Sequence, residues 1–252
     1  MLDFAGQVVI VTGAGSPKGI GRVIARTFGR QGAQLIIADM DKKGLDETVQ
    51  IINDEGGKAD GVLLDVTSKE SVDAMVDYIM KKYGRIDVLV NNAGISQKIT
   101  VADMTLADME RIFKVNMFGL FLVTQACMKP MVAAKYGRIV NLSSVSAKRG
   151  GGIFGGAHYS AAKAGVLAFS KNLSREIAKD GVTINSVCPG LINTEIWKSL
   201  DKELVDKILD DIPMKRPGET QEVADTIVFL ASKEASYITG EEIDINGGSH
   251  MD

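Results

Sequence analysis

Short runs of β-forming residues alternate along the whole chain with segments of helical composition, and this alternation constrains the fold more than any other feature. Seven such runs occur: QVVIVTG, QLIIAD, GVLLD, IDVLVNN, RIVNLSS, VTINSVCPG and EEIDINGG. Alternation of this kind is typical of a parallel sheet with crossover helices. The runs are nearly continuous in apolar residues, as expected where helices cover both faces of a sheet.

These patterns predict an α/β fold in which one doubly wound domain spans residues 1–252. Its sheet should be mostly parallel and seven-stranded, with helices on both faces. No Pro/Ser-rich linker or short repeat divides the chain into further domains. The segment 191–217 interrupts the strand and helix rhythm with charged, helical sequence and two prolines. We predict that it forms a flap on the substrate side of the domain.

Composition excludes several classes of protein. With 252 residues, 45% of them hydrophobic, and a net charge of -3, the chain is long enough for one well-buried core. The absence of a Lys/Arg block argues against a nucleic-acid partner. No apolar run approaches the length of a membrane span, and the first residues lead almost directly into a strand rather than through a signal peptide. We expect no membrane partner and a cytoplasmic location.

Cysteine and histidine are scarce. Cys127 and Cys188 have neither the number nor the spacing of a disulfide framework or a zinc site, so we expect two reduced thiols. His158 and His250 are the only histidines, and no cluster of ligating residues accompanies them. A catalytic metal is therefore not expected.

A glycine-rich turn follows the first strand-like run and opens a helical segment. Glycines between Gly13 and Gly21 allow close approach to a pyrophosphate, whose charge the helix N-terminus stabilises. A tight strand-to-helix connection is the alternative interpretation. Asp39 ends the second run, where its carboxylate can accept hydrogen bonds from ribose hydroxyls or cap the following helix. That carboxylate would repel a 2′-phosphate and favours NAD over NADP, whereas the basic Lys18 in the turn favours NADP.

Tyr159 and Lys163 stand four residues apart in HYSAAKAG, so on a helix they share one face. A neighbouring ammonium stabilises the ionised form of a phenol, whose ordinary pKa is about 10, and allows acid/base catalysis near neutral pH. The alternative is a tyrosine ring packed on a lysine stem. Asn116, in the apolar segment KVNMFG, needs polar partners if it is buried, and a nearby backbone carbonyl is one candidate.

Together with NNAG after the fourth run, SS after the fifth and PG after the sixth, these motifs resemble the classical short-chain dehydrogenase/reductase family. The resemblance extends from about Phe4 to Gly248. It includes NAD-dependent secondary-alcohol and polyol dehydrogenases as well as 3-oxoacyl-thioester reductases acting on acyl carrier protein. It implies a Rossmann fold, a nicotinamide cofactor, a Ser-Tyr-Lys centre with an Asn helper, and usually a homotetramer.

The resemblance implies catalytic roles for Asn116, Ser144, Tyr159 and Lys163. In the family the asparagine holds a water linked to the lysine. The serine is ambiguous, because the usual separation of thirteen residues from the tyrosine fits Ser146, whereas the position at a strand end favours Ser144. We assign the two extra residues to a longer loop at 150–156 and predict Ser144.

Residues expected at the cofactor follow the ends of successive strands. By resemblance they are Gly13, Gly15, Ser16, Lys18, Gly19, Ile20, Asp39, Asp65, Val66, Asn92, Ala93, Gly94, Tyr159, Lys163, Pro189, Gly190, Ile192 and Thr194. The first turn departs from the family, with five rather than three residues between its first glycine and the later Gly-x-Gly. We therefore identify a two-residue insertion around Pro17 and Lys18.

The implied reaction is hydride transfer between NAD(H) and a secondary alcohol or ketone. We expect a small alcohol or a sugar-derived polyol, with Ser96–Ile99, Ile153, Phe154, His158 and Leu191–Leu200 lining its site. The first alternative is an NADPH-dependent 3-oxoacyl-thioester reductase, which would need a basic surface for its carrier protein. The second is a non-enzymatic NAD-binding scaffold. Long apolar helices at 106–131 and 160–178 are the expected contacts of a homotetramer.

Overall fold

The computed structural model describes residues 2–152, 154–194 and 201–251. A seven-stranded sheet lies at its centre, with the strands in the order β3-β2-β1-β4-β5-β6-β7 and all neighbours parallel. The strands are β1 Val8–Thr12, β2 Gln34–Asp39, β3 Lys58–Leu63, β4 Val88–Asn91, β5 Gly137–Leu142, β6 Val182–Pro189 and β7 Glu242–Ile245. The predicted seven-stranded Rossmann sheet is confirmed.

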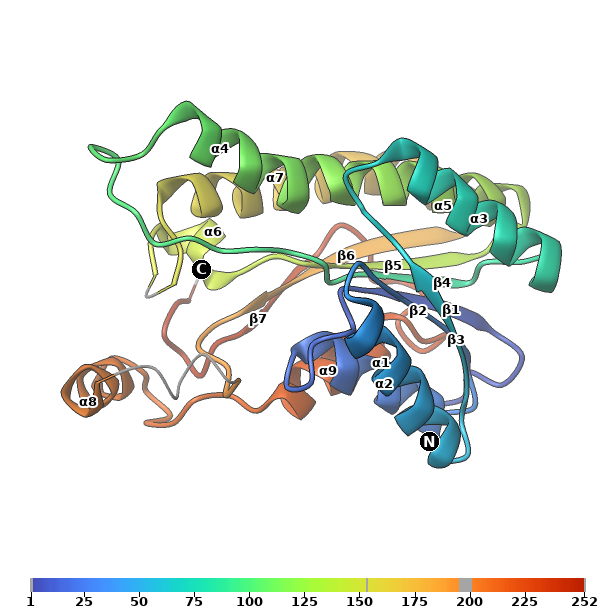
Figure 1. Ribbon diagram of the computed structural model, residues 1–252, viewed down its shortest axis with the longest axis horizontal. Helices are drawn as coiled ribbons and strands as arrows, with labels where there is room; N and C mark the ends of the chain where they lie inside the picture. Colours follow the sequence, from blue (N-terminus) through green and yellow to red (C-terminus); the bar gives the residue numbers. More distant parts are fainter. Residues whose placement is uncertain (1, 153, 195–200, 252) are drawn as a thin grey trace.

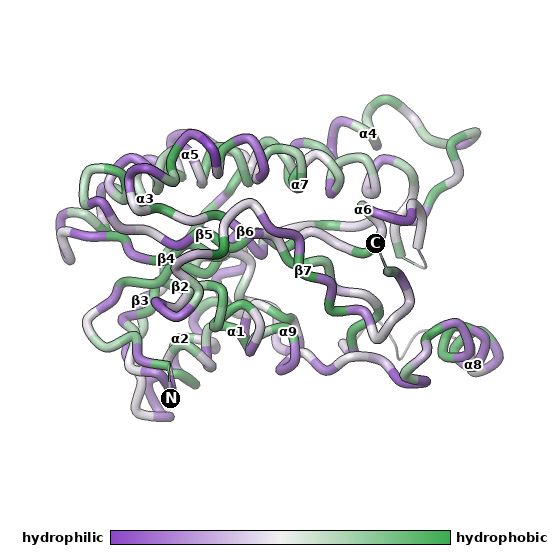
Figure 2. Tube along the Cα trace, turned by 180° about the vertical axis from the view of Figure 1, so that it is seen from behind, coloured by the Kyte–Doolittle hydropathy of each residue, from purple (hydrophilic) through white to green (hydrophobic). Residues whose placement is uncertain are grey.

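Helices cover both faces of this sheet (Figure 1). One layer contains α1 Ile20–Arg30, α2 Lys42–Asp54 and α9 Thr220–Leu230. The other contains α3 Lys69–Tyr83, α4 Leu106–Phe113, η1 Lys114–Gly119, α5 Leu120–Ala133 and α7 Ala157–Ile177. Short helices α6 Val145–Arg149 and η2 Ala178–Asp180 flank α7 in the chain, and α8 Lys202–Asp210 lies apart from both layers (Figure 2).

Each layer buries an apolar stripe on its own face of the sheet. On α1, Ile24 and Phe28 recur with helical spacing and are fully buried, and the Phe28 ring meets Phe4 edge-on at 4.8 Å between centroids. Met75 and Ile79 of α3 have the same helical spacing and are buried against the opposite face of the sheet. Burying one side chain of this size contributes about 1.5–3 kcal/mol, so the two stripes hold the helices to the sheet.

Strand β3 differs from its predicted position. The apolar run GVLLD predicts a strand over residues 61–65, but β3 begins at Lys58 and ends at Leu63. Among the strands of the described residues its only neighbour is β2, and the pairing of Gln34 with Lys58 through Asp39 with Leu63 sets its register. An edge strand is buried less evenly than a central one, so β3 tolerates charged residues that the apolar pattern excluded.

The helical stretch Leu106–Ala133 is long and apolar enough to cross a membrane by length and composition alone. The expectation that no such run exists is therefore wrong. In the structure this stretch comprises α4, η1 and α5, and it packs over the sheet with Val123, Cys127 and Met131 inside the core. We interpret it as a core helix of the α/β fold.

Strand β1 pairs with β2 on one side and with β4 on the other. After β3, at one edge of the sheet, the chain therefore crosses back over β2 and β1 to form β4. The connections from β1 and from β4 therefore diverge toward opposite faces. In doubly wound sheets the carboxyl ends of the strands at this switch point border a crevice where ligands bind. The predicted site residues follow these strand ends, so the topology places them around one crevice.

Candidate active site

A cleft with a volume of about 810 Å³ lies at the carboxyl ends of the strands. Every residue predicted for cofactor binding or catalysis lines it, except Gly15. Gly15 instead lies behind the first turn, where its N–H donates to Asp39 Oδ2 at 2.7 Å. The topology thus brings together residues that are as far apart in sequence as Gly13 and Thr194.

The first turn crosses the fourth strand end at close range. Gly13 has a φ of +66°, and a Cβ there would lie 2.6 Å from Ala93 Cα, so only glycine fits. The Asn92 side-chain amide donates to the carbonyls of Thr12 and Gly13 at 2.9 and 2.8 Å. Asn92 therefore acts as a brace between two strand ends, while its neighbour Asn91 is buried against Thr124 and Asn141.

Helix α1 begins at Ile20 with its N-terminus toward the cleft. The N-cap is Gly19, no side chain caps the helix, and its first turn contains no acidic residue. The first N–H groups of a helix have no partners within it and carry partial positive charge. These features fit an anionic group such as the pyrophosphate of a nicotinamide cofactor. The inserted residues close a turn in which Gly19 N donates to Ser16 O at 3.1 Å.

Asp39 holds its carboxylate in the lining of the cleft, at the end of β2. Oδ2 accepts from Gly15 N at 2.7 Å and Oδ1 accepts from Asp41 N at 2.9 Å. Each carboxylate oxygen has a further lone pair, so the group can still accept from ribose hydroxyls. The cap of α2 is Asp41, which accepts from Lys43 N at 3.1 Å, so the capping interpretation of Asp39 is wrong. Lys18 lines the same cleft.

Tyr159 and Lys163 lie on one face of α7, as their spacing predicts. Lys163 Nζ is 5.9 Å from the centroid of the Tyr159 ring and donates to the Leu142 carbonyl at 2.7 Å. Ser144, at the end of β5, is the N-cap of α6 and accepts from Ser146 N at 3.1 Å. Ser144 also lowers the pKa of the Tyr159 phenol. The three side chains therefore converge on one point of the cleft wall.

Burial controls the protonation of this group. Lys163 is 5% exposed, and burial lowers its pKa from 10.5 to about 8. Burial raises the pKa of Tyr159 above its ordinary value, although the hydrogen bond from Ser144 opposes that change. Lys163 Nζ donates to the Leu142 carbonyl, and burial is the largest influence on the pKa values of both Lys163 and Tyr159.

Among Ser143, Ser144 and Ser146 after the end of β5, Ser144 is the one that acts on the Tyr159 phenol, whose pKa it lowers. Ser143 donates to the Lys163 carbonyl at 2.9 Å and anchors the helix rather than the reacting group. Ser146 is buried, with its hydroxyl beside Gly152. The geometry therefore agrees with the strand-end argument for Ser144. The longer loop does contain two glycines at positive φ, Gly150 and Gly151, after α6.

Asn116 lies in the π-helical turn η1, between α4 and α5. Its amide nitrogen donates to the carbonyls of Ile95 and Ile112, both at 2.9 Å, and its oxygen accepts from Ile95 N at 3.3 Å. A Cβ on Gly94 would lie 2.7 Å from Asn116 Oδ1 and 3.5 Å from Lys163 Nζ. Gly94 therefore borders both side chains. A π-turn inside a helix is common at functional sites, and here it carries Asn116.

Several positions differ from prediction or were missed. His158 is fully buried outside the cleft, with Nε2 3.1 Å from Gln97 Oε1, so it faces neither solvent nor substrate. Arg111 and Val115, four residues apart, line the cleft, as does Arg149. Arg111 and Val115 could have been predicted from their helical spacing in the segment before Asn116. No sequence pattern indicated Arg149.

Part of the predicted substrate wall lies outside the described residues, namely position 153 and positions 195–200 of the expected flap. Within the described ranges, Ser96, Phe154 and Leu191 line the cleft. In the same ranges no group of three or more His, Cys, Asp or Glu side chains could hold a metal ion. Both cysteines are free and buried.

Comparison with known proteins supports these geometric findings. A family model described as enoyl-(acyl carrier protein) reductase matches residues 13–250. The 3-oxoacyl-[acyl-carrier-protein] reductase FabG of Escherichia coli is 39% identical over 99% of this chain and 100% of its own. An uncharacterized short-chain type dehydrogenase/reductase of Sinorhizobium fredii is 41% identical over 96% and 97%.

A solved structure is also similar along its whole length. The crystal structure of 3-oxoacyl-[acyl-carrier protein] reductase from Brucella melitensis matches with a TM-score of 0.93 and 33% identity, covering 99% of this chain and 93% of that one. Fold, site geometry and sequence similarity therefore agree over nearly the full chain. The protein belongs to the short-chain dehydrogenase/reductase family of oxidoreductases, which bind a nicotinamide cofactor.

Proposed function

We propose that the protein reduces a 3-oxoacyl thioester to the 3-hydroxyacyl thioester with NADH, acting on a substrate carried by acyl carrier protein. The observation that carries this proposal is the placement of Ser144, Tyr159 and Lys163 together in the lining of one cleft, with Tyr159 and Lys163 on the same face of α7. Burial raises the pKa of the Tyr159 phenol, and a phenol of raised pKa beside Ser144 is suited to donate a proton to a carbonyl oxygen, as a reductase requires. Relatives named as 3-oxoacyl reductases, similar over the full length, support the substrate class.

The chain's own residues would divide the work at the substrate carbonyl. A nicotinamide cofactor bound in the cleft would supply the hydride to the carbonyl carbon. Ser144 would donate a hydrogen bond to the carbonyl oxygen as negative charge develops there, and Tyr159 would transfer its proton to that oxygen. Lys163 would hold positive charge beside the phenolate that remains. Asn116, next to Lys163 across Gly94, would lead the returning proton toward solvent.

Positively charged side chains along the cleft support a thioester substrate that is attached to an anionic carrier arm. Three cations, Arg111, Lys114 and Arg149, line the cleft in addition to Lys18 and Lys163. The prosthetic arm of acyl carrier protein carries a phosphodiester, which such side chains bind well. Two carboxylates, Asp39 and Asp65, also line the cleft, so cations outnumber anions there although the whole chain carries a net charge of -3.

Asp39 supports NADH as the reductant, because its carboxylate is held in place by two backbone donors and would repel a 2′-phosphate. The same residue favours a second candidate function, the NAD-dependent oxidation of a secondary alcohol or polyol. For either function we propose a homotetramer, whose contacts would come from the apolar helices α5 and α7, and a cytoplasmic location.

The decisive experiment follows the absorbance of NADH or NADPH with acetoacetyl-CoA and with acetoacetyl-acyl carrier protein as substrates. The proposal expects oxidation of NADH, faster with the carrier protein. A control variant, Tyr159→Phe, should lose roughly 10²- to 10⁴-fold in rate while still binding NADH. Activity with NADPH alone would show that the Asp39 argument is wrong, and activity only with NAD and polyols would establish the second candidate.

A further inference from the structure

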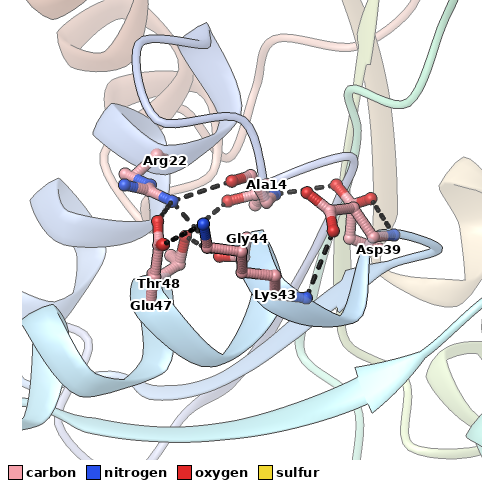
Figure 3. A network of polar contacts seen from close by, with 9 residues as sticks. Ala14, Arg22, Asp39, Lys43, Gly44, Glu47 and Thr48 are labelled. Atoms are coloured by element: carbon pink, nitrogen blue, oxygen red, sulfur yellow. Dashed lines mark hydrogen bonds and ion pairs between the residues drawn. The ribbon is translucent and has the colours of Figure 1, made fainter.

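The glycine-rich turn is held from behind by two side chains that do not line the cleft (Figure 3). Thr48 of α2 is fully buried and donates its hydroxyl to the Ala14 carbonyl at 2.8 Å. Arg22 of α1 is 6% exposed and donates from Nη2 to the Gly15 carbonyl at 2.8 Å. Two successive carbonyls of the turn therefore point away from the cleft, toward the helices.

In a trans peptide the carbonyl and the following N–H point in opposite directions. The peptide group between Ala14 and Gly15 is accordingly fixed at both ends. Its carbonyl oxygen accepts from Thr48, and its N–H donates to Asp39 Oδ2 at 2.7 Å. The group joining Gly15 to Ser16 has its oxygen on Arg22. Its N–H is thereby directed to the opposite side, where Ser16 lines the cleft.

Helix α2 lies close against the glycine-rich turn because of a glycine at position 44. A Cβ on Gly44 would overlap the Gly15 carbonyl, so only glycine lets the helix approach so closely. The Thr48 hydroxyl has one proton, which it shares between the Ala14 carbonyl at 2.8 Å and the Gly44 carbonyl of its own helix at 2.9 Å. The Gly44 carbonyl also accepts from Arg22 Nη2 at 3.2 Å, and Glu47 pairs with Arg22 at 3.4 Å. Burying a guanidinium costs more free energy than burying an apolar side chain. Here Arg22 Nη2 contacts two backbone carbonyls, those of Gly15 and Gly44, and the Glu47 carboxylate.

We propose that Thr48 and Arg22 are cofactor-positioning residues. They orient the longer turn so that the Ser16 N–H faces the pyrophosphate, and through Gly15 they couple that orientation to the Asp39 carboxylate at the ribose. The lengthened turn is thus pre-organised without a contact between these two side chains and the cofactor. This inference depends on the nicotinamide cofactor of the family and not on the identity of the substrate.

The test measures NADH binding by fluorescence titration, without substrate, in Thr48→Val and in the conservative Thr48→Ser. Thr48→Val removes the hydroxyl at nearly constant volume, and we expect the Kd for NADH to rise roughly five-fold, the factor that corresponds to about 1 kcal/mol. Thr48→Ser should restore the wild-type Kd. The matched control is Thr226→Val in α9, and the Kd of this variant should not change. Within the described ranges the Thr226 hydroxyl donates to the Glu222 carbonyl of its own helix and to no part of the glycine-rich turn.

Urea unfolding of the same variants separates positioning from packing. If Thr48→Val lowers the unfolding midpoint but leaves the Kd for NADH unchanged, Thr48 is a packing residue and the proposal is wrong. If Thr48→Val does not fold, Arg22→Lys answers the same question, because it keeps the charge but loses the planar fork that reaches several carbonyls. An increased Kd in that variant supports the proposal, and an unchanged Kd overturns it.

Discussion

Replacing Lys163 by methionine should change the pH dependence of stability in a direction that its burial dictates. The folded protein lowers the pKa of Lys163 from 10.5 to about 8, whereas the unfolded chain restores the ordinary value. At pH 7 both states hold the proton, so the folded protein bears the full cost of a buried charge. As pH rises through 8, only the folded protein releases the proton, and wild-type stability increases relative to a variant that lacks the amine.

The size of this change follows from the two pKa values. At pH 9 neutral Lys163 outnumbers charged Lys163 about ten to one in the folded protein, while the lysine of the unfolded chain remains charged. This difference raises the free energy of unfolding by about 1.3 kcal/mol relative to pH 7. Loss of the bond to the Leu142 carbonyl also destabilises the variant, but that cost does not vary with pH. Between pH 7 and pH 9, wild type should therefore gain about 1.3 kcal/mol over Lys163→Met.

Urea unfolding of both proteins at pH 7, 8 and 9, at one protein concentration, measures this difference directly. Other titrating groups are common to the two proteins and cancel in the comparison. Curves for wild type and Lys163→Met that stay parallel from pH 7 to 9 would mean that Lys163 keeps an ordinary pKa in the folded protein. The account of a buried, weakly basic lysine at the active site would then fail.

Three other outcomes follow from single contacts. Asp39→Ala should weaken NADH binding roughly ten-fold or more, because the Gly15 N–H loses a charged acceptor, and an unchanged titration would contradict this. Gly155→Ala places a Cβ against the Tyr159 ring and should lower kcat roughly 10- to 100-fold with little change in melting temperature; wild-type kcat would refute it. Burial raises the pKa of Cys127 to about 12 and of Cys188 to about 11, so a disulfide reagent at pH 8 should label neither thiol until urea is added.

Sequence patterns determined the class of fold because each signal was local. Apolar runs separated by helical segments can form a covered parallel sheet, and the spacing of Tyr159 and Lys163 places both on one helix face whatever surrounds them. The position of β3 could not be read in this way. Its register depends on pairing with β2, and the charged residues of an edge strand resemble those of a loop.

The site was predictable where its residues follow strand ends, since the topology of a doubly wound sheet gathers those ends at one crevice. Only the tertiary structure decided the protonation of the site, because the low pKa of Lys163 depends on how completely other elements bury it. It also decided the contacts of Arg22 and Thr48, whose partners are backbone carbonyls of a distant turn. A carbonyl is present at every position of a sequence, so contacts of this kind leave no pattern to recognise.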